Sequence, residues 1–237
     1  MCGKGRLILF VFYARHLLQE GRYLFNCVFI LTDCVDFFRG GMYNQFDLFV
    51  AVLCNTETIY RVKYSITKQG IYKEVLMKIR PLENNDIPRI LQIYNYYITD
   101  TTVSFEEEPL TLEVFTSRVE SICKNYPFIV AEENGTVIGY AYLDRFHERS
   151  AYRHTADLSI YLDKDCLSKG TGSALLEHIE NLGREQGITS IISLVTGENT
   201  RSIAFHRKHS YREVGIMKNV GIKFNRPLDV FYFQKEL

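Results

Sequence analysis

The chain has 237 residues, enough for one domain or for one domain with a large extension. Its 28 basic and 28 acidic residues cancel, which argues against a dedicated nucleic-acid-binding protein because such proteins carry a basic surface. No apolar run reaches the roughly 18 residues that a membrane span needs, so we predict no membrane partner. The six cysteines form no CxxC pair, which supports neither a zinc ribbon nor a thioredoxin-type motif, and so few cysteines predict a reducing, cytoplasmic location. No other metal-binding pattern is apparent, so we predict no metal site.

Residues 1–76 differ in composition from the rest of the chain. They contain none of the five prolines but four of the six cysteines, and their apolar residues come in clumps, such as 7–13, without a steady period of about 3.6 or 2 residues. We interpret residues 1–76 as an N-terminal extension of unknown role. Three interpretations stay open: a product of an upstream start codon, a small accessory or dimerisation segment, and a membrane-surface anchor.

Residues 77–237 carry the pattern of one folded domain, in which strands alternate with helices. The expected strands are 78–80, 128–132, 137–143, 154–162, 190–195, 211–218 and 229–234. The expected helices are 86–97, 111–124, 171–186 and 199–209. Asn134-Gly135 predicts a tight hairpin turn between two of these strands. Strands and helices that alternate around one sheet predict a mixed α/β, or α+β, layer fold.

The expected strand 154–162 has two unlike faces. One face is apolar and predicted to be core: Ala156, Leu158, Ile160 and Leu162. The other face is polar throughout: Thr155, Asp157, Ser159 and Tyr161. A polar face on a central strand lines either solvent or a cleft, so the pattern fits a half-exposed strand as well as an active-site wall that contains Asp157.

A glycine-containing turn, Lys169-Gly170-Thr171-Gly172-Ser173, follows that strand and opens an amphipathic helix. The two glycines let the backbone approach a ligand closely, and a helix N-terminus offers free N–H groups that suit a pyrophosphate. The turn lacks the Gly-Lys-Ser/Thr end of a P-loop and the third glycine of a dinucleotide fingerprint. By itself it fits an ordinary structural turn equally well.

The helix 199–209 places Asn199, Ser202, Ile203 and His206 on one stripe. The simpler interpretation makes Asn199 an N-cap and His206 a solvated or core histidine. The functional interpretation places both at a ligand site beside the glycine turn.

Taken together and in this order, the three elements resemble the GNAT acetyltransferase superfamily, and within it the phosphinothricin and methionine sulfoximine N-acetyltransferase-like family. The resemblance covers nearly all of residues 77–237. The stretches that carry it are 93–98, 102–105, 108–109, 129–132, 139–142, 149–152, 159–161, 170–172, Asn199 with 202–206, and 229–230.

The resemblance implies a GNAT fold, with a central mixed, mostly antiparallel sheet flanked by helices. It implies transfer of the acetyl group of acetyl-CoA to the amine of a small amino acid or analogue, without a metal, by a protein that can form a homodimer. Two alternatives stay open: a peptide or protein N-acetyltransferase, and a non-catalytic CoA-binding module.

Carried over by position, the resemblance also implies roles for single residues. The acetyl-CoA contacts would come from Ile160, Tyr161, Leu162, Lys169, Gly170, Thr171, Gly172 and Ser173. Asn199 would contact the pantetheine arm or order the helix beside it. Arg149 and Tyr152 would bind the acidic group of the acceptor, with Phe105 on its aliphatic part. Asp157 takes the place of a Glu general base, and His206 that of a Tyr that protonates the thiolate.

The sequence departs from the family pattern at four positions. Leu167 replaces a Gln or Arg before the glycine turn, Ser210 replaces a Gly, and Pro227 replaces a Trp. Asp157 is one methylene shorter than Glu. Since a model Asp has a pKa of ~3.9, we expect Asp157 to work through a water molecule or merely to position the amine, unless burial raises its pKa.

Overall fold

The computed structural model describes residues 28–31, 45–55, 58–67, 70–167 and 170–237, with side chains from Met77 onward. The chain divides into two compact units. One unit comprises Met1–Arg80 with Glu132–Thr136, and the other comprises Pro81–Ala131 with Val137–Leu237. No helix in the described part is long and apolar enough to cross a membrane. Every predicted site residue that the structure describes belongs to the second unit.

The first unit contains antiparallel strands that the sequence patterns did not predict. They are β1 (Val28–Leu31), β2 (Gln45–Asn55), β3 (Thr58–Thr67) and β4 (Gly70–Pro81). Of these four strands, the sequence predicted only the end of β4, as the strand 78–80. The sequence patterns gave no element for residues 1–76, whereas the structure has strands there. In β3, for example, Tyr60, Val62 and Tyr64 do alternate with Arg61 and Lys63, but the clumped residues around it obscure this period.

Six further strands follow in the rest of the chain: β5 (Phe128–Glu133), β6 (Thr136–Arg145), β7 (Thr155–Leu162), β8 (Ser190–Thr196), β9 (Arg212–Lys223) and β10 (Arg226–Glu236). They neighbour one another in the order β5-β6-β7-β8-β10-β9. The β6–β7, β8–β10 and β10–β9 pairs are antiparallel, whereas β7 and β8 are parallel. The predicted mixed, mostly antiparallel sheet is confirmed.

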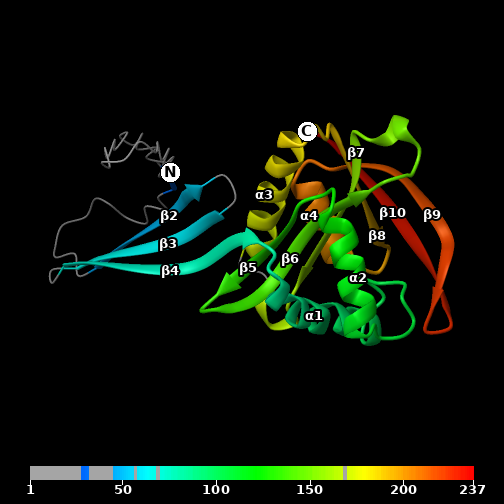
Figure 1. The fold of residues 1–237 in the computed structure, drawn as a ribbon, viewed down its shortest axis with the longest axis horizontal. Helices are drawn as coiled ribbons and strands as arrows, with labels where there is room; N and C mark the ends of the chain where they lie inside the picture. Colours follow the sequence, from blue (N-terminus) through cyan, green and yellow to red (C-terminus); the bar gives the residue numbers. More distant parts are fainter. Residues whose placement is uncertain (1–27, 32–44, 56–57, 68–69, 168–169) are drawn as a thin grey trace, which may run out of the picture. The chain divides into compact units, whose positions relative to one another are not determined.

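Four helices cover this sheet: α1 (Ile87–Thr99), α2 (Leu112–Cys123), α3 (Thr171–Glu185) and α4 (Thr200–Lys208) (Figure 1). Helices α1 and α2 share a buried cluster with β5 and β6, which includes Ile90, Phe115, Val130 and Tyr140. Leu143 points to the opposite face from Tyr140, because side chains alternate along a strand. A Cβ atom on Gly183 of α3 would lie 2.9 Å from Leu143 Cδ1, so α3 covers that opposite face.

Local backbone chemistry explains where the helices begin. The side chain of Thr111 accepts a hydrogen bond from the Val114 N–H and caps α2 as an N-cap. Asp86 occupies the N-cap position of α1, but its carboxylate accepts a hydrogen bond from the Glu83 N–H at 2.8 Å and caps no N–H of α1. Asp86 thereby closes the preceding 3-10 turn, Asn84–Asp86, in a capping box.

Several turns use the left-handed backbone region. Asn134 (φ 51°) and Gly135 (φ 77°) take this conformation between β5 and β6, as the Asn-Gly pair predicts. Phe224 and Asn225 do the same between β9 and β10. Ser210 also has a positive φ of 67°, at the position where the family resemblance leads one to expect Gly. A non-glycine residue there carries a cost of roughly 1–2 kcal/mol.

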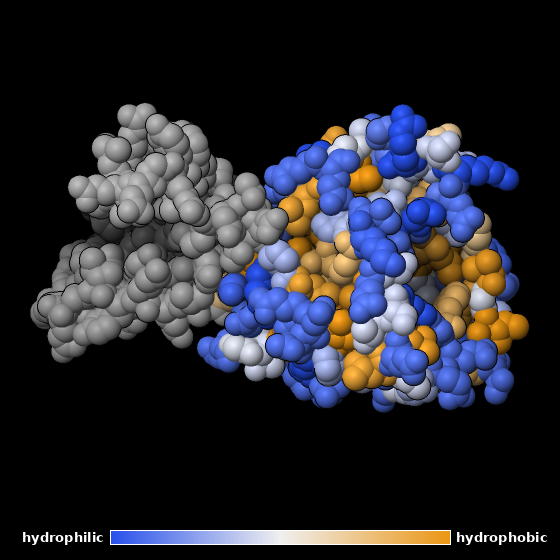
Figure 2. All heavy atoms as spheres, viewed as in Figure 1, coloured by the Kyte–Doolittle hydropathy of each residue, from blue (hydrophilic) through white to orange (hydrophobic). Residues whose placement is uncertain are grey.

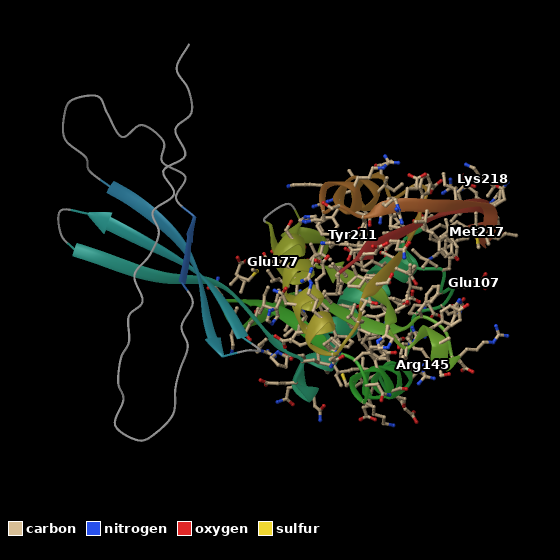
Figure 3. All side chains as sticks on the ribbon, turned by 90° about the horizontal axis from the view of Figure 1, so that it is seen from above. Glu107, Arg145, Glu177, Tyr211, Met217 and Lys218 are labelled. Carbon is tan, nitrogen blue, oxygen red and sulfur yellow. The ribbon has the colours of Figure 1, made fainter. Side chains whose placement is uncertain are left out.

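Strand β9 lies at the end of the strand order and exposes large apolar side chains, among them Val214, Met217, Val220 and Ile222. Figure 3 labels Met217 and Lys218 on this strand. Figure 2 shows hydrophobic side chains among the hydrophilic ones on the visible face. The core of the second unit therefore lies against β5 to β8 and β10, and not against most of β9.

A buried carboxylate joins α3 to the end of the sheet. Glu180 accepts hydrogen bonds from Lys235 Nζ at 2.6 and 2.8 Å and from the hydroxyl of Tyr211 at 3.0 Å (Tyr211 is labelled in Figure 3). Burial raises the pKa of Tyr211, and the Glu180 charge adds to the effect, so the tyrosine stays a neutral donor. Because the side chain of Glu180 is only 6% exposed, these partners replace the water molecules that its carboxylate loses on burial.

We predict that Lys235→Met lowers the free energy of unfolding by about 3 kcal/mol, because it leaves the buried Glu180 carboxylate with only the Arg184 guanidinium, 3.8 Å away, as a cation. The matched control is Lys164→Met, which breaks an ion pair between side chains that are 54% and 75% exposed. That change should cost less than about 1 kcal/mol. Urea unfolding of both variants measures the difference, and equal midpoints would contradict the assignment of Glu180 as a buried charge.

Candidate active site

The central feature of the site is the divergence of β7 and β8. These parallel strands are paired at only three positions: Thr155 with Ser190, Ala156 with Ile191, and Asp157 with Ile192. Both strands are described to their ends, and beyond Asp157 neither pairs with the other. Alternate backbone groups of Leu158–Leu162 therefore lack a strand partner on the β8 side. Backbone amides need partners when they are shielded from water, so this opening suits a ligand that has amide groups of its own.

Asp157 stands at the last paired position, where the opening begins. One of its carboxylate oxygens, Oδ1, is buried and has no hydrogen-bond partner among the described residues. Burial raises the pKa of Asp157 to about 7, and the negative charge of Asp144 contributes further. This is the case that the sequence left open, in which burial raises the pKa of Asp157 toward neutral pH.

The polar face of β7 is less uniform than its sequence suggests. Tyr161 does not line solvent: its ring packs 5.2 Å from Tyr94, 5.3 Å from Tyr97 and 5.3 Å from Tyr140, between ring centroids. Burial raises the pKa of Tyr161 well above its usual range. Of the two ionisable groups on this face, Asp157 is thus the one whose pKa lies near neutral pH.

The other face of β7 agrees with the predicted core at its start only. Ala156 and Leu158 are buried, whereas Ile160 and Leu162 are half-buried. The carbonyl oxygen of Leu162 accepts a hydrogen bond from the hydroxyl of Tyr97, on α1, at 2.6 Å. This contact fixes the end of β7 just before the glycine turn.

The glycine turn forms the N-terminus of α3 as predicted. Gly170 is the N-cap with a φ of 84°, which glycine adopts without strain. A Cβ atom on Gly172 would lie 3.5 Å from Leu162 Cδ1 and 3.5 Å from Phe205 Cε2, so β7, α3 and α4 meet here. Thr171 is buried. The first N–H groups of a helix have no partner within it, and they attract anions. Lys169 lies outside the described residues.

Asn199 caps α4. Its side-chain oxygen accepts a hydrogen bond from the Ser202 N–H at 3.1 Å, as the simpler interpretation of the sequence holds. Helix α4 is also linked to α3, because Ser173 Oγ lies 2.9 Å from His209 Nε2. The two predicted cofactor-binding segments therefore form one connected surface.

His206 is buried on the side of α4 that faces the sheet. Its ring lies 5.3 Å from Phe233 and 5.1 Å from Tyr211, between ring centroids. Nδ1 lies 2.8 Å from the carbonyl oxygen of Ser202, which can only accept, so Nδ1 carries the proton. Nε2 is buried without a partner among the described residues, and burial lowers the pKa of the ring. In this arrangement His206 is neutral at pH 7 and Nε2 has no proton to donate.

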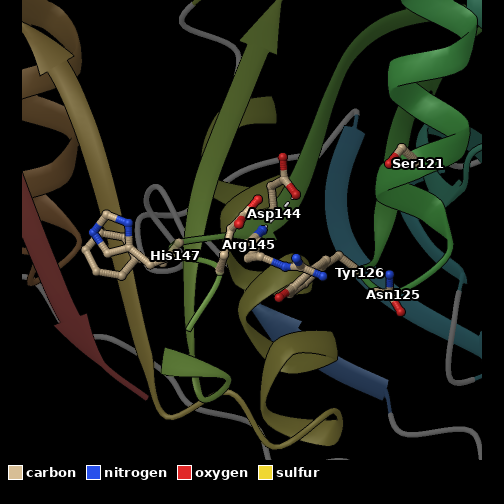
Figure 4. Close-up of a pocket in the computed structure, with 8 residues that line it drawn as sticks. Ser121, Asn125, Tyr126, Asp144, Arg145 and His147 are labelled. Atoms are coloured by element: carbon tan, nitrogen blue, oxygen red, sulfur yellow. Dashed lines mark hydrogen bonds between the residues drawn. The ribbon is translucent and has the colours of Figure 1, made fainter. Parts of the chain in front are cut away.

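Arg149 and Tyr152, which are predicted to bind the acceptor substrate, lie on one loop but contact different residues. Arg149 lines a surface cavity of about 510 Å³, together with Arg145, Ser150 and Arg153. Tyr152 packs on the same loop, 5.2 Å from His147 and 5.7 Å from Phe146 between ring centroids. A second cavity of about 380 Å³ shares five lining residues with the first and also includes Asp144, on β6 (Figure 4). The lining therefore extends from Arg149 to the residue opposite Asp157.

Phe105 lies on the loop between α1 and α2 and packs on the backbone of β9. A Cβ atom on Gly221 would come within 2.2 Å of the Phe105 ring, so the contact requires glycine. The same loop is held by Lys223, which is buried and donates a hydrogen bond to the carbonyl oxygen of Ser104. Phe105 itself remains 38% exposed and can contact a ligand.

The sequence patterns did not single out Asp144, Tyr97 or Lys223, which all contact or flank predicted site residues. A signal existed for Asp144, because it lies two and four positions after Tyr142 and Tyr140 on one strand face. No sequence signal gives the pairing register that sets Asp144 opposite Asp157.

Comparison with known proteins identifies the fold and its relatives. Residues 79–231 match the family model described as an acetyltransferase (GNAT) domain. The phosphinothricin N-acetyltransferase of Alcaligenes faecalis is 32% identical over 67% of this chain and 82% of its own length. A phosphinothricin acetyltransferase from Sinorhizobium meliloti, solved in complex with AcCoA, is 34% identical with a TM-score of 0.66 over 69% of this chain and 89% of its own.

A second similar structure belongs to a protein named for a different acceptor. The ribosomal-protein-alanine N-acetyltransferase from Brucella melitensis is 34% identical, with a TM-score of 0.66 over 67% of this chain and 99% of its own. Relatives of one fold thus carry the names of both small-molecule and protein acceptors.

We predict that Asn199→Ala lowers the free energy of unfolding by about 1 kcal/mol, because the Ser202 N–H loses its partner. Asn199→Asp is the matched control, since Asp caps helices as well as Asn does. Thermal unfolding of both variants measures the effect. An alanine variant as stable as the wild type would contradict a capping role.

Proposed function

Because the chain belongs to the GNAT acetyltransferase family, we propose that it transfers the acetyl group of acetyl-CoA to the amine of a small amino acid or analogue that carries an acidic group. The observation that carries the proposal is the position of Asp157. It is a half-buried carboxylate whose Oδ1 has no hydrogen-bond partner among the described residues and whose pKa is raised to about 7, at the point where β7 and β8 separate. A carboxylate with a pKa near 7 can accept the proton that the amine must lose before it reacts.

The residues around the opening fit acetyl-CoA. The unpaired backbone of Leu158–Leu162 offers donors and acceptors to the amide groups of the pantetheine arm. The N-terminus of α3, from Gly170 to Ser173, offers N–H groups to the diphosphate. Acetyl-CoA supplies the thioester whose carbonyl carbon receives the amine.

Asp157 acts as the general base in this proposal. The acceptor's ammonium group must lose a proton before its nitrogen can attack, and Asp157 accepts it directly or through one water molecule. Backbone N–H groups of β7 stabilise the negative charge that develops on the thioester oxygen. The thiol that leaves has a pKa of about 8.5, so a neutral His206 is no obstacle to its departure.

Arg149 holds the acceptor's acidic group. Its guanidinium has the planar, bidentate geometry that matches a carboxylate or phosphinate, and it lines the cavity that extends toward Asp144. Tyr152 supports the same loop, and Phe105 packs on the aliphatic part of the acceptor. Holding both substrates in a reactive orientation supplies a large part of the acceleration.

We further infer that the reaction takes place in the cytoplasm, with neither nucleic acid nor membrane as a partner. The balanced charge of the chain supports the absence of nucleic acid. Free thiols at Cys123 and Cys166 suit a reducing compartment.

A second candidate function is acetylation of a peptide or protein amine, which the name of the Brucella melitensis relative favours. The two functions differ in how they depend on Arg149. A small acidic acceptor has one main anionic group for Arg149 to bind, whereas a peptide distributes its contacts along a surface.

The test is the release of free CoA thiol by the purified full chain with acetyl-CoA and a panel of acceptors. The panel contains phosphinothricin, methionine sulfoximine, methionine sulfone, the common amino acids and alanine-starting peptides. We predict thiol release with small acidic acceptors, and a loss of at least about 100-fold in kcat/KM for Arg149→Ala because a charge-assisted bidentate contact disappears.

Arg153→Ala is the matched control, because Arg153 lines the same cavity and is not assigned to the acceptor. It should keep activity within a few-fold of the wild type. Thiol release with peptides alone, or full activity of Arg149→Ala on amino acids, would contradict the proposal.

We predict that Gly221→Ala raises the KM for the acceptor about 10-fold or more and leaves the KM for acetyl-CoA unchanged. The new Cβ would overlap the Phe105 ring and displace it from the acceptor site. Gly215→Ala on the same strand is the control, because nothing lies within 4 Å of its Cβ position. Steady-state kinetics with each substrate varied in turn measures both constants. Equal acceptor KM values for the two variants would remove Phe105 from the acceptor site.

A further inference from the structure

Asp144 and Asp157 form a pair of like charges on neighbouring strands. They are directly opposite each other in the β6–β7 register, so their side chains point to the same face of the sheet. Residues opposite each other in an antiparallel pair have Cβ atoms roughly 4.5–5.5 Å apart, and like charges at such positions are destabilising. We therefore expect a pair of like charges at these positions to serve a function that compensates for its cost in stability.

The described surroundings supply no cation to this pair. Asp144 Oδ1 accepts a hydrogen bond from the Arg145 backbone N–H at 2.7 Å (Figure 4). On β8, the residue in register with Asp157 is the apolar Ile192. Neither carboxylate forms an ion pair with another described residue.

The other charged groups near the pair lie on α2 and on the loop after β6. Arg118 of α2 donates to Glu106 at 2.6 Å and is occupied there. Arg145, His147 and Glu148 line the cavity with Asp144, but none of them is in register with Asp157. Asp144 is thus the charged residue that β6 sets directly opposite Asp157.

We propose that Asp144 is a positioning residue of this enzyme that acts through Asp157: its negative charge, held on the same sheet face, raises the affinity of Asp157 for the acceptor's proton. The proposal rests on the proposed function, in which Asp157 is the base. The direction of the pKa shift of Asp157, upward through burial first and Asp144 second, agrees with it. No cation of the protein has to neutralise Asp157, because Asp157 accepts a proton from the ammonium group of the acceptor.

The ionisation of Asp157 determines how kcat/KM changes with pH. Asp157 accepts a proton only when it is ionised, so kcat/KM falls as the pH drops through the pKa of Asp157. Removal of the Asp144 charge removes a repulsion, which lowers that pKa. The acid limb of the profile then moves to lower pH, while the rate on the alkaline plateau decreases because Asp157 becomes a weaker base.

The experiment measures kcat/KM of the full chain with one acceptor as a function of pH. The ionisation of the acceptor affects the wild type and the variants alike, so it cancels in the ratio of the wild-type profile to each variant's profile. We expect the wild-type acid limb near pH 7. Asp144→Asn should move the limb about one pH unit lower, whereas Asp144→Glu should restore it. Glu148→Gln is the matched control: it removes a carboxylate from the same cavity wall and should leave the limb in place.

Two results would overturn the role of Asp144. One is a uniform drop in kcat/KM for Asp144→Asn with an unmoved limb, which a merely structural role would give. The other is an equal shift in Glu148→Gln. Asp157→Asn separates these failures from a failure of the proposed function, because an acid limb that survives in Asp157→Asn removes Asp157 as the base altogether.

Discussion

The early separation of β7 and β8 is the constraint on which the site depends. Parallel neighbours in a sheet normally pair along their length, yet these strands pair at only three positions and then diverge at Asp157. The cost is a set of backbone groups without strand partners. The benefit is an opening in the middle of a rigid sheet, where a ligand can complete the hydrogen bonds that the strands leave unmade.

The other parts of the site are arranged around this opening. Gly172 brings the start of α3 against Leu162 and Phe205, which sets a helix N-terminus beside the free end of β7. Asp157 stands where pairing stops, and burial together with Asp144 raises its pKa to about 7. In the proposed function, a single feature of strand pairing thus serves both the binding of the donor and the deprotonation of the acceptor.

The sequence predicted most of the second unit because its signals are local. Apolar periodicity and the Asn134-Gly135 and Gly170-Gly172 turns gave the strands and helices, and the resemblance to GNAT proteins pointed to Asp157. The sequence did not predict β1 to β3, whose alternation is hidden among clumped apolar residues. It could not predict the register that sets Asp144 opposite Asp157, or decide between a solvated and a core His206, because register and packing arise from residues far apart in the chain.

The measurement that tests this account most directly is amide hydrogen exchange, read residue by residue by NMR, with and without acetyl-CoA. The account predicts that acetyl-CoA slows exchange at alternate amides of Leu158–Leu162 and at the first turn of α3, because these N–H groups gain partners. Amides on the β6 side of β7 should change little. Unchanged exchange along Leu158–Leu162, with acetyl-CoA bound elsewhere, would contradict the claim that the gap between β7 and β8 is the donor site.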